Sequence, residues 1–488
     1  MLGVILALLI VPLAAGLACA LLPEPAKIGP AVTGTCGVAS FGLVLVLVPA
    51  AAHHDLNYLS YLRVDALSAI FLLATGFLYG AVAVYAVGYL KGHHDRRFYA
   101  ALNLFAWAML AAPLLGNLAL LWIAVEVTTI ISALLVAIED TDGAAEAAWK
   151  YVLIASAGLG LALLGTVFAY YAGAQVLGEH YDLAIGPLIA AGPHLAHTPV
   201  RLAFLLALLG YGTKVGFFPV HTWLPDAHSE APTPVSALLS GSLLAVSFYA
   251  ILRFYQFTAA ALGSGFPRDA LLAFGVASLL LAALYVFGQR DVKRLLAYSS
   301  VEHMGILAVG VSFGAPVALA GVMLHVLAHA AAKGNAFMGA GVLTVKYRTK
   351  EISAMRGVLD LLPWSGPLFL LAIFALSAMP PSGIFRSEFQ IVYGGLAGGN
   401  YAAAAVLVVL VTVAFFGLTA ASTRMLFTPA PRSLSAAAAG PADSGEPSAW
   451  MVVPVVAGVA VLFILGLHPP GELTDLISRA VTLLGAGR

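Results

Sequence analysis

The chain has 488 residues, of which 61% are hydrophobic and 9% are charged, and its formal net charge is zero. A soluble protein of this size carries about a quarter charged residues, so the composition excludes an ordinary soluble protein and indicates a polytopic membrane protein. The zero net charge gives no support for a nucleic-acid partner, and the two cysteines, Cys19 and Cys36, cannot supply the four ligands of an iron–sulfur cluster.

A helix needs about 20 consecutive apolar residues to cross a bilayer. Fourteen stretches of the chain fit this length, so we predict an all-α protein with about fourteen transmembrane helices. The predicted spans are 2–22, 30–51, 65–89, 98–115, 117–138, 147–172, 202–223, 233–255, 270–288, 294–313, 316–344, 361–390, 401–426 and 450–468. The first is predicted to be a membrane helix and not a cleaved signal, because no basic segment precedes it.

Basic residues in the connecting loops predict the orientation of the chain. They concentrate in alternate loops, as at Lys91 and Arg290, and are scarcer in the opposite set, to which Arg63 and Arg253 are assigned. Loops rich in lysine and arginine face the cytoplasm. Both termini are therefore predicted to lie outside the cytoplasm, which an even number of spans requires.

Two predicted spans contain breaks, at Pro219 and at the sequence Pro380-Pro381-Ser382-Gly383. The breaks are five spans apart, which predicts two inverted five-helix repeats of opposite topology. The predicted organisation is an N-terminal three-helix segment at 1–97, a first repeat at 98–256, a second repeat at 257–427, and a linker, last span and amphipathic segment at 428–488.

The first break lies in the most informative stretch of the chain. Lys214 is inside an apolar run, and His221, Asp226 and His228 follow the break. A charge inside a membrane helix is retained only where it faces protein or water, and a broken helix at that depth must line a cavity. Charge and break together predict an ion pathway.

Glu126 lies in the middle of the fifth predicted span, and Lys214 is its expected partner. In a coupled pair, displacement of the lysine charge makes the carboxylate take up a proton. The alternative is a neutral carboxylic acid held by a backbone carbonyl.

His325, His329 and Lys333 are spaced four residues apart, so they line one stripe of a helix. A stripe of this kind facing a hydrated interior forms a proton relay, because histidine exchanges protons near neutral pH. The alternative is a zinc site. It is disfavoured because no cysteine or carboxylate lies close in sequence to complete the ligand set.

Two further pairs lie in the tenth and twelfth predicted spans. Glu302 is the better pathway candidate of its pair. His303 points about 100° away from Glu302 around the helix, and a packing hydrogen bond explains it as well as a role in the pathway does. Glu388 is a candidate terminal site after the second break. Arg386 is expected to pair with Glu388, a local ion pair that would fix the break, or with a lipid phosphate.

The chain resembles the antiporter-like proton-translocating subunits of respiratory complex I, Mrp cation/proton antiporters and group 4 hydrogenases, and within them the hydrogenase-4 component F type. The similar stretches are WIAVEVTTIISALLV from Trp122, EAAWKY from Glu146, GTKVGFFPVHTWLPDAHSEAPTPVSALLS from Gly212, QRDVKRLLAYSSVEHMG from Gln289, HVLAHAAAK from His325 and MPPSGIFRSEF from Met379. The resemblance implies a fourteen-helix fold with two inverted repeats, a polar axis, and a place inside a larger complex of a prokaryotic cytoplasmic membrane.

Residue by residue, the resemblance implies that Glu126 and Lys214 form the key carboxylate–lysine pair. It implies that His325, His329 and Lys333 form the central relay, with Glu388 as the terminal site. Lys150 and Ser240 lie in the matching stretches as supporting polar residues.

The sequence departs from complex I relatives in the eighth span, where a linking lysine or histidine is usual. Here that span offers only hydroxyl groups, those of Ser236, Ser240, Ser242, Ser247 and Tyr249. Either water held by these hydroxyls bridges the two halves, or only one half-channel conducts.

Three functions follow from this sequence. The first is a proton-translocating subunit whose nickel–iron and iron–sulfur centres lie in hydrophilic partner subunits, with no cofactor in this chain. The second is a cation/proton antiporter or a transport partner in inorganic-carbon uptake, with sodium as the alternative ion; a relay rich in nitrogen favours protons. The third is an assembly subunit whose channel is silent.

Overall fold

The computed structural model describes the chain except for residues 22–24, 59–60, 91–95, 430–444 and 486–488. Within the described residues, twelve helices are long and apolar enough to cross a membrane, judged by length and composition. The prediction of an all-α polytopic membrane protein is therefore confirmed. The short antiparallel hairpin of β1 (Leu56–Tyr58) and β2 (Leu62–Val64) was not anticipated.

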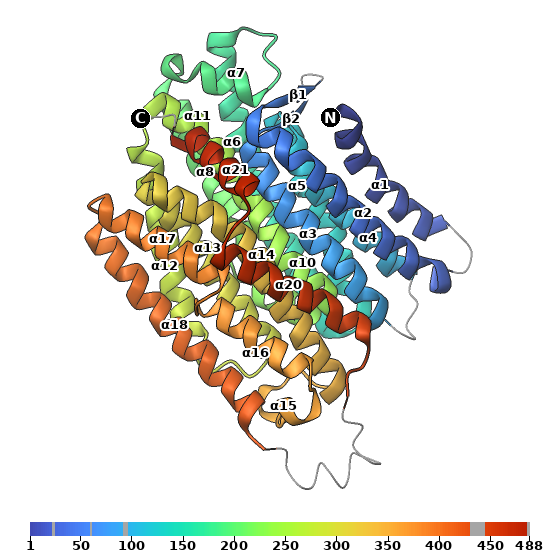
Figure 1. The fold of residues 1–488 in the computed structure, drawn as a ribbon. Helices are drawn as coiled ribbons and strands as arrows, with labels where there is room; N and C mark the ends of the chain where they lie inside the picture. Colours follow the sequence, from blue (N-terminus) through green and yellow to red (C-terminus); the bar gives the residue numbers. More distant parts are fainter. Residues whose placement is uncertain (22–24, 59–60, 91–95, 430–444, 486–488) are drawn as a thin grey trace.

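The N-terminal part contributes four long helices, whose packing is visible in Figure 1. They are α1 (Leu2–Leu21), α2 (Pro25–His53), α3 (Ala66–Tyr89) and α4 (Arg96–Ala111), the last followed by the 3-10 turn η1 (Ala112–Leu114). Helix α1 packs on α4, and α2 packs on α3. Asp65 caps α3 by accepting a hydrogen bond from the backbone nitrogen of Ser68.

The middle of the chain contains the first broken helix. Its elements are α5 (Leu118–Val136), η2 (Ala137–Glu139), α6 (Asp142–Leu177), α7 (Ile185–Ala190), η3 (Gly192–His194), α8 (His197–Val215), α9 (Trp223–Glu230), α10 (Thr233–Leu238), the π-helical turn η4 (Leu239–Leu243) and α11 (Leu244–Leu262). The predicted break is present, but α8 already ends at Val215. Gly216 adopts a left-handed conformation, with φ of 85°, which terminates the helix before Pro219 is reached.

The C-terminal part contains the second broken helix. Its elements are α12 (Gly265–Tyr285), α13 (Val292–Phe313), α14 (Pro316–Tyr347), η5 (Ile352–Ala354), α15 (Val358–Leu361), α16 (Ser365–Leu376), α17 (Gly383–Ala397), α18 (Tyr401–Phe427), α20 (Ala449–Leu467) and α21 (Gly471–Gly485). The break between α16 and α17 lies where the sequence predicts it, and Ser382 caps α17.

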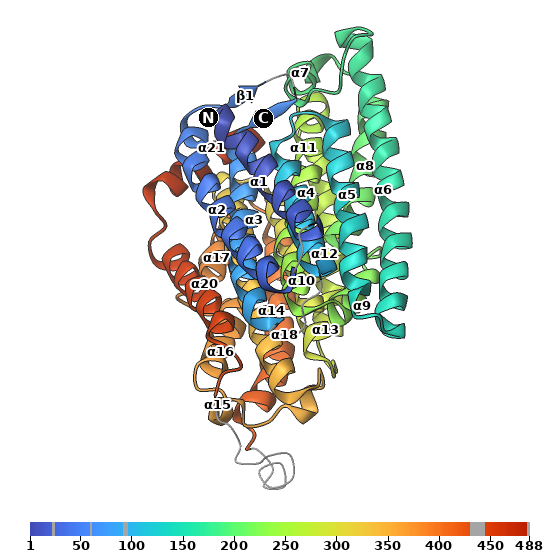
Figure 2. The same ribbon diagram turned by 90° about the vertical axis from the view of Figure 1, so that its right-hand side faces the viewer.

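Burial is graded across the bundle. The rod formed by α10, η4 and α11 is fully buried over its most apolar stretch, and α13 and α14 are nearly so. Helices α5, α6 and α18 expose apolar side chains on their outer faces, as at Ile130, Leu153 and Val409, and Figure 2 shows α5 and α6 along one flank. Ionisable side chains can therefore lie away from lipid on these buried helices.

The amphipathic C-terminal segment folds as α21 and packs against α2, α3 and α14. Arg479 of α21 forms an ion pair with Asp55 at 2.7 Å. The start of α1 and the helix α21 lie at the same end of the bundle (Figure 1). Residues 430–444 of the predicted linker, and Lys91 among the loop residues used for orientation, lie outside the described part of the chain.

Candidate functional site

A row of buried polar side chains runs through the middle of the bundle, starting at Lys214. Because Gly216 ends the helix, Lys214 lies in the last turn of α8, and its side chain is completely buried. Its ammonium donates a hydrogen bond to the hydroxyl of Tyr151 on α6, whose ring it also faces at 4.8 Å from the centroid. The Tyr151 hydroxyl is in turn 2.8 Å from the hydroxyl of Ser132 on α5. Tyr151 thus connects the lysine to the fifth span.

Glu126 lies on α5, near this group but not in direct contact with Lys214. Its Oε1 accepts a hydrogen bond of 2.9 Å from Ser156 of α6, and its Oε2 has no hydrogen-bond partner among the described residues. The carboxylate and the Lys214 ammonium interact electrostatically. The described residues contain no ion pair between them within 4.0 Å. The sequence places the two correctly as neighbours, whereas the structure inserts Tyr151 as the group that touches the lysine.

His228 occupies the space between the two halves of the bundle. Its ring lies 6.2 Å from the ring of Trp223, and the Trp223 ring lies 4.5 Å from that of Tyr151. On the other side, the His228 ring lies 5.6 Å from Phe337 of α14. The histidine Nδ1 is engaged by the Leu224 carbonyl at 2.7 Å, and Nε2 is buried with no hydrogen-bond partner within the described chain.

The π-helical turn in the eighth span supplies a second connection. Ser240 lies in η4, and its hydroxyl is 2.7 Å from the hydroxyl of Ser300 on α13. The Ser240 carbonyl faces Nε2 of His329 at 3.4 Å. A π-turn shifts backbone hydrogen bonds by one residue and is frequent at functional sites. The hydroxyl-rich span therefore touches the second half directly, although it lacks a lysine or histidine.

Lys333 begins the second group of buried ionisable residues. It is fully buried on α14, and its ammonium donates to the hydroxyl of Ser299 and, at 3.0 Å, to the carbonyl of Leu296. Glu302, on the same helix as Ser299, interacts with Lys333 electrostatically. The second lysine is thus held by a hydroxyl and has a carboxylate nearby, as the first one does.

Three histidines continue the row beyond Lys333. His325 and His329 lie one turn apart on α14, and His303 reaches them from α13, with its Nδ1 3.0 Å from Nε2 of His325. His303 therefore contacts the predicted relay. Nδ1 of His325 faces the hydroxyl of Ser387 on α17 at 2.9 Å.

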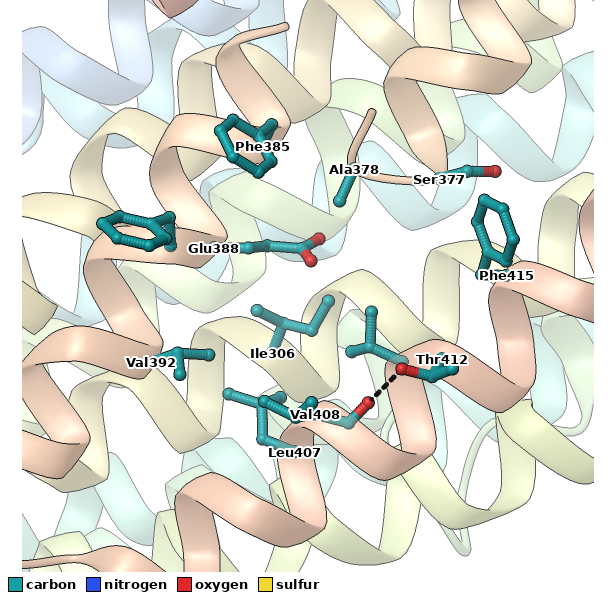
Figure 3. Close-up of a pocket in the computed structure, with 12 residues that line it drawn as sticks. Ile306, Ser377, Ala378, Phe385, Glu388, Val392, Leu407, Val408, Thr412 and Phe415 are labelled. Atoms are coloured by element: carbon teal, nitrogen blue, oxygen red, sulfur yellow. Dashed lines mark hydrogen bonds between the residues drawn. The ribbon is translucent and has the colours of Figure 1, made fainter. Parts of the chain in front are cut away.

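Glu388 ends the row at the opposite flank from Glu126. Its Oε1 lies 3.9 Å from Nδ1 of His303. Figure 3 shows its carboxylate projecting between Ile306 and Ala378, in a cavity of about 390 Å³ with a mainly apolar lining. The sequence analysis expected Arg386 to pair with Glu388, and this ion pair is absent from the described part of the chain. Arg386 instead points toward the end of α20 and donates to the carbonyls of Gly466 and Leu467.

Two predicted supporting residues lie at the end of the bundle that holds α9, away from the buried row. Lys150 forms ion pairs with Glu146 at 2.5 Å and Asp226 at 3.6 Å, and Asp226 also pairs with Arg294 at 2.7 Å. These pairs are partly exposed, so each contributes little to stability.

His221, a third supporting candidate, lies in the break itself. Its Nδ1 has no hydrogen-bond partner within the described chain, and its ring faces Phe218 at 6.1 Å. His221 and the ion-paired group around Lys150 therefore both lie outside the row from Lys214 to Glu388.

The sequence analysis placed Arg253 in a loop and so did not predict its buried ion pair with Asp65, near the hairpin. Arg253 is instead enclosed in α11, where it donates to Asp65 at 2.7 Å and to Ser68 at 2.9 Å. Burial alone would raise the pKa of Asp65, but the guanidinium groups of Arg253 and Arg63 lower it to about 2. The signal that was available is Asp65 immediately before an apolar run, the position of a helix cap.

Comparisons with known proteins identify the family to which the whole chain is similar. Residues 115–416 match the family described as "NADH:quinone oxidoreductase/Mrp antiporter, TM". A hydrogenase-4 component F homolog of Methylacidiphilum infernorum is 33% identical over 87% of this chain and 89% of its own length. NADH-quinone oxidoreductase subunit N of Desulforudis audaxviator is 31% identical over 86% and 84%.

Among solved structures, a chain of the membrane-bound sulfane sulfur reductase, an archaeal respiratory membrane complex, has the same fold. The TM-score is 0.87 at 19% identity, covering 99% of this chain and 98% of that one.

Proposed function

Because the chain belongs to the NADH:quinone oxidoreductase/Mrp antiporter membrane family, we propose that it is a proton-translocating subunit of a group 4 hydrogenase-type, complex I-related respiratory complex. The observation that carries the proposal is the row of ionisable side chains that starts at the half-buried Glu126 and continues through buried groups from Lys214 to Glu388. Such residues are rare inside membranes, because burying each one is costly, and they mark ion pathways.

In this proposal, Glu126 and Lys214 form the first proton-binding unit, and Tyr151 links Lys214 to Ser132 on α5, the helix that also carries Glu126. The phenol oxygen of Tyr151 accepts a hydrogen bond from Lys214 and is also hydrogen-bonded to the hydroxyl of Ser132. It can therefore take up a proton from Lys214 as it releases its own proton toward Ser132. A change in the charge or position of Lys214 alters the electrostatic stabilisation of the Glu126 carboxylate, which binds or releases a proton in response.

The second unit runs from Lys333 through the histidines to Glu388. Imidazole groups bind a proton at one nitrogen and release it at the other, so His325 and His303, in contact at 3.0 Å, form a continuous step. Glu388 lies at the end of this step and is proposed to exchange protons with the neighbouring flank.

The two units are proposed to communicate through His228, with Ser240 and Ser300 as a hydroxyl route beside it. The unpartnered Nε2 of His228 is buried between Trp223 and Phe337. Water molecules between these groups would complete the path, since water bridges polar groups that do not touch. This arrangement favours a pathway through both halves over a single conducting half.

We further propose that the two halves are inverted repeats, at 98–256 and 257–427. Glu126 and Glu302 lie on helices five spans apart, and each half has one broken helix with an ionisable residue near its break, Lys214 before the first break and Glu388 after the second. The segments 1–97 and 428–488 flank the repeats. The chain would lie in a prokaryotic cytoplasmic membrane with both termini outside.

Partner subunits are part of the proposal. Other membrane subunits would cover the apolar flanks formed by α5 with α6 and by α17 with α18, and lipid would cover the rest. Hydrophilic subunits would carry nickel–iron and iron–sulfur centres, and this chain would move protons without a redox centre of its own. The nitrogen-rich relay favours protons over sodium, which prefers oxygen ligands.

The experiment is proton transfer by the purified complex in proteoliposomes, with redox turnover measured in the same sample. We expect Lys214→Gln to reduce proton transfer at least tenfold while turnover of the soluble subunits persists. Lys150→Gln is the matched control, because that lysine belongs to the same half but is partly exposed and lies outside the buried row, and it should leave transfer near the wild-type rate. Equal transfer in wild type and Lys214→Gln would contradict the proposal.

Copurification in mild detergent separates the proposal from its alternative. Nickel–iron and iron–sulfur subunits in the preparation would support the redox-coupled pump. Their absence, together with sodium- or bicarbonate-dependent flux in liposomes, would assign the chain to a cation/proton antiporter or an inorganic-carbon uptake system instead. Redox subunits that turn over with no proton transfer in wild type would indicate a silent assembly subunit.

A further inference from the structure

The three buried histidines form a compact group of nitrogen ligands. One ring nitrogen from each of His303, His325 and His329 lies within 4.8 Å of the other two. The rings come from two helices, α13 and α14, and all three side chains are completely buried. The sequence disfavoured a metal site because it offered only two histidines on one helix and no further ligand nearby. The fold supplies both missing elements.

Hydrogen bonds outside the group leave lone pairs pointing into it. The Ser387 hydroxyl donates to the Ile384 carbonyl at 2.8 Å, so its oxygen accepts from Nδ1 of His325, and Nε2 of that ring is unprotonated and carries a lone pair. Nε2 of His329 faces the Ser240 carbonyl, which can only accept, so the unpartnered Nδ1 carries the lone pair. Outer hydrogen bonds of this kind orient metal-ligating histidines.

A carboxylate completes the set. Oε1 of Glu388 lies 3.9 Å from Nδ1 of His303 and has no hydrogen-bond partner within the described chain. Its side chain also lines the 390 Å³ cavity in Figure 3. A cation that reaches this cavity therefore meets Glu388 first and the imidazoles behind it.

We propose that His303, His325, His329 and Glu388 form a binding site for a divalent transition metal ion, with Zn²⁺ as the best fit. Zinc takes four nitrogen or oxygen ligands in a tetrahedron at about 2.0–2.2 Å, which places neighbouring ligand atoms roughly 3.3 Å apart. The His303–His325 contact is already 3.0 Å. His329 lies within 4.8 Å of the other two histidines, and Glu388 is 3.9 Å from His303, so these two side chains must rotate inward to complete the tetrahedron.

Metal binding moves one proton within the site. In the metal-free chain, Nδ1 of His303 donates to Nε2 of His325. When both nitrogens bind the metal, the His303 proton moves from Nδ1 to Nε2, which has no partner among the described residues. The negative charges of the Glu388 and Glu302 carboxylates compensate the positive charges of the metal ion and Lys333.

A consequence for transport rests on the proposed function, whereas the binding itself does not. A zinc ion on these four side chains occupies the nitrogens that would carry protons between Lys333 and Glu388. Micromolar zinc is therefore expected to stop proton transfer without displacing any subunit.

The test is titration of the purified full-length chain, in detergent, with Co²⁺, whose visible absorption becomes intense when it is four-coordinate. We expect one tightly bound Co²⁺ per chain, displaced by Zn²⁺. His303→Gln and His329→Gln should each weaken binding on the order of 100-fold, because each removes one of four ligands. His228→Gln is the matched control, a buried histidine outside the group, and should retain the site.

Two further results separate this inference from the proposed function. Lys214→Gln should bind Co²⁺ normally even when proton transfer is lost, because Lys214 is not a ligand. Equal Co²⁺ affinity in wild type, His303→Gln and His329→Gln, or a weak octahedral spectrum in all of them, would overturn the metal site whatever the transport assay shows. Circular dichroism of each variant establishes that the helices are intact.

Discussion

The Lys214 ammonium donates a hydrogen bond to the hydroxyl of Tyr151 and does not touch Glu126. The phenol is therefore the group through which the lysine reaches the fifth span. Its position also explains why a lysine in the last turn of α8 is tolerated, because the ring face and the hydroxyl both stabilise the ammonium.

Tyr151→Phe is expected to slow proton transfer at least tenfold while leaving the fold intact. The substitution keeps the ring packed against Trp223 and removes only the oxygen that bridges Lys214 and Ser132. The measurement is the initial rate of proton uptake in proteoliposomes. Tyr211→Phe is the control, because Tyr211 is equally buried but, among the described residues, makes no hydrogen bond to Lys214, Ser132 or Glu126. A Tyr151→Phe rate equal to that of Tyr211→Phe would remove the phenol from the pathway.

His228→Asn tests whether the two halves communicate through the gap beside η4. Asparagine fills part of the volume but does not titrate, so we expect proton transfer to fall by at least tenfold at neutral pH. His197→Gln, at the exposed start of α8, is the control. If His228→Asn transports normally and the double variant Ser240→Ala with Ser300→Ala does not, the hydroxyl route alone would join the halves.

Arg253→Gln is expected to destabilise the protein by about 3–5 kcal/mol, because it leaves the Asp65 carboxylate buried without its main partner. The matched control is Arg479→Gln, which breaks the partly exposed pair with Asp55 and should cost no more than about 1 kcal/mol. Thermal unfolding in detergent measures both. Similar unfolding temperatures for the two variants would show that burial of the Arg253 pair has no energetic effect.

The Asp65 pair also predicts how stability depends on pH. The folded pKa of Asp65 is lowered to about 2, and the unfolded value is about 3.9. A lowered pKa stabilises the fold above the unfolded value, so this contribution of about 2–3 kcal/mol is complete above about pH 4 and is lost as the pH falls toward 2. Asp65→Asn should flatten this part of the stability curve, and an unchanged curve in that variant would contradict the assignment.

Gly210→Ala is expected to destabilise the contact between α6 and α8 by about 1–3 kcal/mol. A methyl group there would meet the backbone nitrogen of Ala162 and lie 2.6 Å from the carbonyl of Gly158, neither of which can rotate away. Gly160→Ala on the same pair of helices is the control, because nothing lies within 4 Å of its added carbon. That variant should be neutral or slightly stabilising. Equal thermal stability of both variants would disprove the close packing.

The sequence by itself determined the class of the protein and the identity of most ionisable groups at membrane depth. Long apolar runs must be helices in lipid, because every backbone polar group needs an internal partner. A lysine or glutamate in such a run must face protein, which is why Lys214, Lys333 and Glu388 could be selected from the sequence alone. The two helix breaks followed equally directly from the prolines, although Gly216 ends α8 before Pro219 is reached.

The tertiary structure alone decided which of these groups meet. Helical periodicity relates residues within one helix, so it aligned His325 with His329 but could not bring His303 to them from α13. It could not place Tyr151 between Lys214 and Ser132 or turn Arg386 away from Glu388. Contacts between residues far apart in sequence depend on how the helices pack against one another, and that packing is decided by the whole set of buried side chains at once.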